Sequence, residues 1–75
     1  MKTDKTIDCK GMACPMPIVK LSKAMKELVG GQVLSVTADD AGFEPDVKAW
    51  CENTGNALKG LERQGEVTTA YIEKA

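Results

Sequence analysis

The residue with the clearest chemistry in this chain is Cys14, which stands in the sequence Cys14-Pro15-Met16-Pro17. Proline fixes φ near the helical value and lacks the N–H that a first helical turn leaves unpaired, so the two prolines predict a helix that begins at Pro15. Cys14 then falls at or beside the N-cap, where free backbone N–H groups and the positive end of the helix dipole converge. The thiolate is the nucleophilic form of cysteine, and this position favours it. The spacing therefore predicts a reactive thiol, against the commoner role of cysteine as a small packed residue.

The composition excludes several other kinds of chemistry. The 75 residues contain no histidine, which removes Cys-His and Ser-His pairs and the commonest transition-metal ligand, so we expect no metal, no cofactor and no stand-alone hydrolase. A net charge of −1 and one residue each of Phe, Trp and Tyr make a nucleic-acid partner unlikely on physical grounds. The N-terminus leads into no apolar stretch of membrane-spanning length. We therefore expect a cytoplasmic protein without membrane contact.

The chain has three cysteines, an odd number, and in a reducing compartment they are free thiols by default. Cys9 lies in a short alternating run that predicts a strand over 6–9, with Ile7 and Cys9 turned toward the core. Cys51 lies on the apolar stripe of a predicted helix. Packing is the expected role of both, and a disulfide between Cys14 and either of them is the alternative.

A long amphipathic run follows the motif. From Pro15 onward the apolar positions recur every three or four residues, which predicts a helix with one buried face that Gly30-Gly31 ends. The buried face comprises Ile18, Leu21, Ser22, Met25, Leu28 and Val29. Lys20, Lys23, Lys26 and Glu27 fall largely on the opposite side, as a solvated face or as a basic docking surface next to the thiol. Gly11, in the connection before the motif, is free to adopt a backbone conformation that other residues resist.

The rest of the chain predicts one more helix and three more strands. A strand is expected over 32–38, and Asp39-Asp40 then reads as a loop with a capping carboxylate rather than a cation site. A helix is expected over 43–54, with Val47, Trp50, Cys51 and Thr54 buried and Gly55 at its end. Strands over 57–62 and 67–73, joined by a turn at 63–65, place Ile72 in the core.

The element order is therefore β-α-β-α-β-β in a single domain, residues 1–75, with residues 1–4 expected to be a disordered N-terminus. The compact arrangement for this order is an α/β (α+β) two-layer sandwich, in which two helices pack on one face of a four-stranded mixed sheet. The opposite face of the sheet is left open, either wet or available to a partner.

These residues resemble the TusA/SirA-like family of small sulfur-carrier proteins. The matching features are a strand followed by Asp8-x-Lys10-Gly11, the Cys14-Pro15-x-Pro17 signature at the start of a helix, and Gly31 before the second strand. Asp39-Asp40, Asp46 and the Trp50-Cys51 pair also fit. The similarity spans nearly the whole chain. Two features depart from the family pattern. Lys10 stands where many members have Arg, so the position keeps its charge but lacks the planar guanidinium group. Cys9 is an additional thiol.

The resemblance implies a sulfurtransferase-like carrier rather than a stand-alone catalyst. Cys14 would carry a persulfide, with Pro15, Pro17, Lys10 and Gly11 in support and with Cys9 and Cys51 as secondary thiols. Partners would be a cysteine desulfurase or rhodanese-like donor and a sulfur-accepting protein, in tRNA thiolation, sulfur oxidation or cofactor biosynthesis. We expect a monomer. The residues themselves are consistent with a carrier. Thiol exchange needs a thiol that ionises near ambient pH and needs no general base, and this chain has no histidine.

Two other functions compete with the carrier. A thiol redox or regulatory module would use a disulfide between Cys14 and Cys51 or Cys9, and the three-thiol count motivates it. A binding module would use the open face of the sheet, with RNA as one ligand, and the low positive charge disfavours it.

Overall fold

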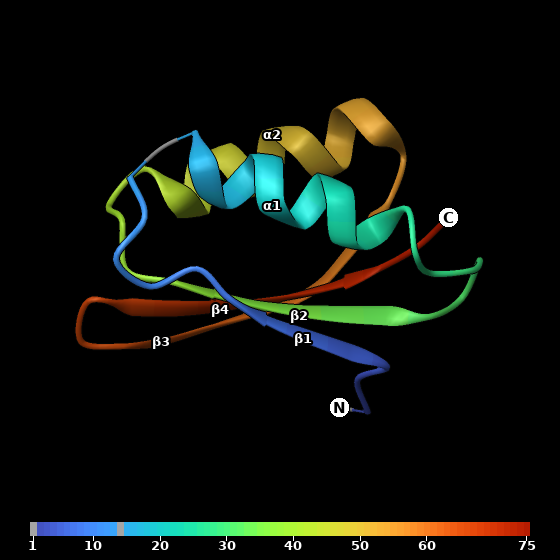
Figure 1. Ribbon diagram of the computed structural model, residues 1–75, viewed down its shortest axis with the longest axis horizontal. Helices are drawn as coiled ribbons and strands as arrows, with labels where there is room; N and C mark the ends of the chain where they lie inside the picture. The colour runs from blue at the N-terminus through green and yellow to red at the C-terminus, as the bar shows by residue number, and fades with distance from the viewer. Residues whose placement is uncertain (1, 14) are drawn as a thin grey trace.

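The computed structural model describes residues 2–13 and 15–75. Its elements in chain order are β1 (Lys5–Asp8), α1 (Met16–Met25), β2 (Val33–Ala38), α2 (Phe43–Thr54), β3 (Ala57–Gln64) and β4 (Val67–Glu73). The strands form one sheet in the order β1-β2-β4-β3, and both helices cover the same face of it (Figure 1). The β1–β2 ladder is parallel, whereas β2–β4 and β3–β4 are antiparallel. The predicted two-layer β-α-β-α-β-β fold with a mixed sheet is confirmed.

The core lies between the helices and the central strands. Leu34, Val36 and Ala38 alternate along β2 toward the helices and are fully buried, as the period of two predicts. Ile72 on β4 is also fully buried, and this prediction is confirmed. The helices contribute Leu21, Ala24 and Met25 from α1 and Phe43, Val47 and Cys51 from α2. Burial of this one apolar layer is what holds a chain of this size together.

Helix α2 has the predicted bounds, but its buried stripe is narrower than expected. It ends at Gly55, whose φ of +78° and amide bond to the Cys51 carbonyl form a left-handed cap. Trp50, predicted to be core, is only half-buried, and Thr54, predicted on the same stripe, is exposed. The Thr54 hydroxyl instead donates to the Trp50 carbonyl at 2.8 Å. Trp50 is less buried because it lies where α1 and α2 meet the outer surface, beside Pro15 and Ile18.

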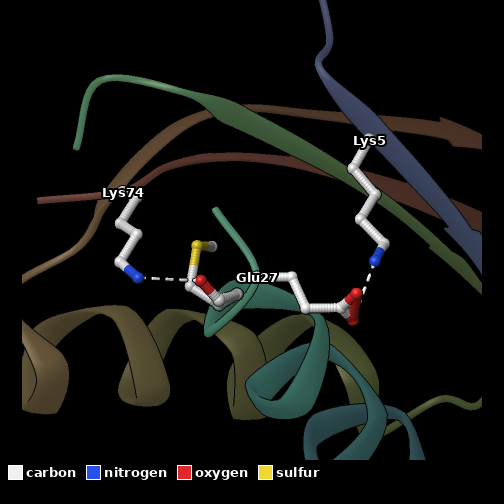
Figure 2. A network of polar contacts seen from close by, with 4 residues as sticks. Lys5, Glu27 and Lys74 are labelled. Atoms are coloured by element: carbon white, nitrogen blue, oxygen red, sulfur yellow. Dashed lines mark hydrogen bonds and ion pairs between the residues drawn. The ribbon is translucent and has the colours of Figure 1, made fainter. Parts of the chain in front are cut away.

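Helix α1 ends earlier than the glycine signal predicts. Its last residue is Met25, and Val29, predicted on the buried face, is 66% exposed, so that prediction is wrong. A residue from the other end of the chain contacts this terminus. The Lys74 Nζ donates to the carbonyl oxygens of Met25, at 3.0 Å, and Leu28, at 2.7 Å, and the contact to the end of α1 is drawn in Figure 2. A cation at the carbonyls of a helix end stabilises that end.

The β3–β4 hairpin is also displaced from its predicted position. Strand β3 continues to Gln64, which pairs with Val67, so the connecting loop is Gly65-Glu66 rather than residues 63–65. Gly65 has a φ of +62°, the conformation that a two-residue hairpin loop requires of its first residue.

Asp4, in the terminal segment 1–4, contacts the sheet. The Asp4 amide donates to the Val33 carbonyl, and the Val33 amide donates to the Asp4 carboxylate, both at 2.8 Å. The disorder expected for 1–4 therefore remains a prediction for the residues that precede Asp4.

Candidate functional site

The candidate site lies at the start of α1. Cys14 itself, and with it the prediction that its thiol sits at or beside the N-cap, lies outside the described residues. The residues on either side of it, Ala13 and Pro15, are exposed, and Pro17 is buried. The cap residue of α1 is Pro15, with Met16 as the first helical residue. The helix thus begins one residue later than the prolines predict, and Pro17 occupies the second position.

The first turn of α1 has fewer free amides than its sequence predicts. Pro15 and Pro17 have no N–H. The Met16 amide donates to the Ala13 carbonyl at 2.9 Å. The amides of Ile18 and Val19 both donate to the Pro15 carbonyl at 3.1 Å. An anion at this helix end would therefore be stabilised by the field of the aligned peptide dipoles and by cations, and not by hydrogen bonds from these amides.

The loop that leads into the motif connects β1 to α1, and hydrogen bonds to β1, to β2 and to the loop after β2 hold it. The Cys9 amide donates to the Thr37 carbonyl at 2.6 Å, which extends the β1–β2 ladder past the end of β1. The Lys10 amide donates to the Asp8 carboxylate at 2.9 Å. Gly11 has a φ of +83°, which confirms the special conformation predicted for it. Its amide donates to the Asp39 carboxylate at 3.0 Å.

The Asp39-Asp40 pair has a second role that its sequence does not predict. Asp40 serves the loop before α2 as expected, since its carboxylate accepts from the Gly42 amide at 3.0 Å. The Asp39 carboxylate instead accepts from Gly11, in the loop before the motif. The order of the strands could have predicted this contact. Loops that follow adjacent parallel strands meet at the same sheet edge, and those after β1 and β2 do so here (Figure 1).

Two lysines supply positive charge near this loop. Lys10, predicted as a supporting residue, is exposed. The Lys20 Nζ, on the second turn of α1, approaches the Asp8 carbonyl at 3.4 Å. The Lys20 charge also acts on the nearby Cys9 thiol, whose pKa it lowers against the larger, raising effect of burial. The structure therefore gathers the loop, the start of α1 and a cation at one edge of the sheet.

The other two cysteines are part of the core. Cys9 is 0% exposed and Cys51 is 4% exposed, and both are free thiols. Burial raises the pKa of the Cys9 thiol and of the Cys51 thiol above the ordinary value of 9.0. Such thiols stay protonated and unreactive at neutral pH. Cys9 and Cys51 therefore pack in the core, which is the role predicted for both.

Neither a metal site nor a membrane span is found in the described part of the chain. Across residues 2–13 and 15–75, His, Cys, Asp and Glu side chains form no group of three or more that could hold a metal ion. The helices in those ranges are also too short and too polar to cross a bilayer.

Comparison with known proteins is consistent with this geometry. The family described as "Sulfurtransferase TusA" matches residues 5–74. The chain belongs to this family. A relative in Bacillus subtilis (strain 168), named "Putative sulfur carrier protein YrkI", is 46% identical over 99% of both chains. The "Sulfur carrier protein TusA" of Allochromatium vinosum is 37% identical over 96% of this chain and 95% of its own.

A solved family structure has the same architecture. The crystal structure of the SirA-like protein from Desulfitobacterium hafniense superposes with a TM-score of 0.80 at 30% identity, over 92% of this chain and 95% of that one. The TusA family domain also occurs in longer proteins. This chain spans only 38% of a relative from Aquifex aeolicus and 40% of another from Bacillus subtilis, both named as sulfur carrier proteins.

Proposed function

We propose that this protein carries sulfane sulfur as a persulfide on Cys14, which it receives from a donor protein and passes to an acceptor protein. Family membership supports the sulfur-carrier role. The observation that carries the assignment to Cys14 is the burial of the other two thiols, because Cys9 and Cys51 are packed in the core with a raised pKa. Cys14 is the thiol that stands in the sequence between the anchored Gly11 and the start of α1.

Loading proceeds by thiol exchange. The Cys14 thiolate attacks the outer sulfur of a persulfide on the donor, the S–S bond of the donor breaks, and the donor cysteine leaves as a thiolate. A new S–S bond forms at Cys14, whose outer sulfur carries the negative charge. The exchange consumes no oxidant or reductant. Release to the acceptor repeats the same step, so the carrier needs no general base of its own, in agreement with a chain without histidine.

The partners proposed for this chemistry are those that the resemblance to the sulfur-carrier family implies. The donor is a cysteine desulfurase or a rhodanese-like protein, and the carrier acts as a cytoplasmic monomer. Lys10 and Lys20 favour an anionic sulfur at the start of α1, whereas Gly11, Pro15 and Pro17 shape the loop and the first helical turn. The proteins that donate and accept supply the remaining catalytic groups.

Mass spectrometry of the intact protein tests the proposal. After incubation with a cysteine desulfurase and L-cysteine, or with inorganic polysulfide, we expect a gain of about 32 Da, one sulfur atom, that a reductant removes. Cys14→Ala should abolish the gain. Cys51→Ala, the matched control, should retain it because that thiol is buried. Equal sulfur gain in Cys14→Ala and the wild type would contradict the assignment.

The redox alternative requires a buried thiol to reach Cys14. Both Cys9 and Cys51 are covered by the core, so a disulfide to either would displace packed side chains. Peptide mapping after mild oxidation distinguishes the two functions, since the carrier should show no intramolecular disulfide.

A further inference from the structure

A shallow groove runs between the two helices on their outer side, next to the motif. On the α1 side it is lined by Pro15, Ile18, Val19, Ser22, Lys23 and Lys26, and Trp50 of α2 closes it. A second groove shares Pro15, Ile18 and Trp50 and continues along α2 past Asp46. The two grooves meet at Trp50 and Pro15, and Pro15 is the residue that follows Cys14 in the sequence.

Apolar side chains are exposed at the motif end of this groove. Met16 is 52% exposed and Val19 is 39% exposed, and both lie in the first turn of α1. Val19 lines the groove together with the partly buried Trp50. Exposed apolar area next to a groove marks an interaction site, and tryptophan is the side chain most enriched where binding energy concentrates. Met16 and Val19 are not part of the core. Helix α1 packs on the sheet through Pro17, Leu21, Ala24 and Met25.

The end of the groove away from the motif is basic. Lys20, Lys23 and Lys26 are exposed, and α1 contains no acidic residue, whereas the whole chain has a net charge of −1. Lys23 and Lys26 line the groove. The ion pairs found within residues 2–13 and 15–75 join Lys5 to Glu27 and Lys48 to Glu44, so neither groove lysine takes part in them. Both ammonium groups are available to carboxylates of another molecule.

We propose that this surface, formed by Pro15, Val19, Lys23, Lys26 and Trp50, docks an acidic segment of the sulfur-donating protein. The segment carries one apolar side chain that enters the groove beside Trp50, and carboxylates that pair with Lys23 and Lys26. This inference rests on the proposed function and adds to it the chemistry of the partner. Pro15, which lines the groove, follows Cys14 directly in the sequence. A donor docked in the groove therefore has its sulfur close to the carrier cysteine.

Charge reversal tests the docking surface. The variant Lys23→Glu/Lys26→Glu is compared with Lys2→Glu/Lys59→Glu, which changes the net charge equally through exposed lysines outside the groove. Two donors are first compared on the wild type: a cysteine desulfurase with L-cysteine, and a rhodanese with thiosulfate. The readout is the initial rate of persulfide formation on Cys14 from the donor that loads the wild type faster. We expect the groove variant to be slowed about tenfold or more, the control about twofold or less, and the wild-type rate to fall with added salt.

Separate measurements keep the docking inference distinct from the proposed function. Alkylation of Cys14 by iodoacetamide, which is uncharged, should differ by about twofold or less between groove variant and wild type, which shows that the thiol itself is intact. If inorganic polysulfide fails to load the wild type, the proposed function fails. If polysulfide loads it but neither protein donor does, or the groove and control variants are slowed equally, the docking inference is overturned.

Val19→Asp provides an independent apolar probe of the same surface. We expect it to slow loading from the protein donor about tenfold while the protein stays monomeric in sedimentation velocity. A wild-type dimer that Val19→Asp dissociates would assign the groove to a second copy of the chain and overturn the proposal. Retention of the wild type on single-stranded RNA, lost in Lys23→Glu/Lys26→Glu, would overturn it in favour of a phosphate ligand.

Discussion

Hydrogen bonding at the start of α1 limits how an anion there could be stabilised. The amides of Met16, Ile18 and Val19 are already paired with carbonyl oxygens, so an anion at the helix start gains mainly from the dipole field. That field is worth about 0.3–1 kcal/mol at exposed sites. Lys20 adds a charge whose effect reaches Cys9. For the proposed persulfide we therefore expect long-range electrostatics to matter more than hydrogen bonds from these three amides.

Asp39 is predicted to position the loop before Cys14. Replacing it with Ala leaves the Gly11 amide without its carboxylate partner, and we expect a loss of about 1–2 kcal/mol in the free energy of unfolding. The rate of sulfur transfer from a protein donor should fall severalfold, because the loop is no longer fixed. Urea unfolding and transfer kinetics measure the two effects.

A second substitution at the same position distinguishes positioning from charge. Asp39→Asn keeps an oxygen that can accept from the Gly11 amide, so it should recover most of the stability and transfer rate that Asp39→Ala loses. Identical behaviour of the two variants would show that the carboxylate acts through its charge and not through this hydrogen bond.

At the scale of elements, the end of α1 depends on a residue from the end of the chain. Lys74 follows β4, and its Nζ donates to the carbonyl at the end of α1 (Figure 2) and to the Leu28 carbonyl just beyond it. On the other side of the same turn, Lys5 of β1 pairs with Glu27 at 2.9 Å, through side chains that are 32% and 66% exposed. The two contacts join both ends of the chain to one helix terminus, but they differ in exposure.

Lys74→Met should therefore destabilise the protein more than Lys5→Met does. Loss of a charge-assisted, partly buried cap on two carbonyls is expected to cost about 1–2 kcal/mol. The exposed Lys5–Glu27 pair contributes about 0–1 kcal/mol and is screened by salt. Chemical unfolding of the two variants at low and high salt measures the difference. Equal losses at both salt concentrations would contradict the capping role of Lys74.

The whole molecule has one core, and two of its members are ionisable. Burial raises the pKa of the Cys9 and Cys51 thiols above 9.0. In the unfolded chain these thiols release their protons near the ordinary value, whereas in the folded protein they retain them. Above that pH the unfolded state therefore binds fewer protons, and the free energy of unfolding falls as the pH rises.

We expect the wild type to lose stability between pH 8 and about pH 10, and Cys51→Ala to lose less over the same range. The measurement is urea unfolding at each pH, and the difference between the two proteins isolates the Cys51 thiol from the groups they share. Cys51→Ala also leaves a small cavity, which lowers stability at every pH but does not change the slope. Parallel pH profiles would show that burial of Cys51 does not control its ionisation.

The sequence alone determined those elements whose signals are local. The alternation of Leu34, Val36 and Ala38 specifies β2 and its buried face, because side chains on a strand point to opposite faces in turn. The bounds of α2 follow from its apolar period and from Gly55, which accepts the left-handed conformation that ends it. The order of elements then limits the compact arrangements to few, and the two-layer sandwich is one of them.

Only the tertiary structure decided the features that depend on residues distant in the sequence. Lys74 caps the end of α1 at Met25 from 49 positions away. Asp39 holds Gly11 across 28 positions because adjacent parallel strands bring their loops together. Trp50 is half-buried because α1 and α2 leave a groove there. Periodicity and capping signals report on a few neighbouring residues, whereas these contacts form only when the sheet has assembled.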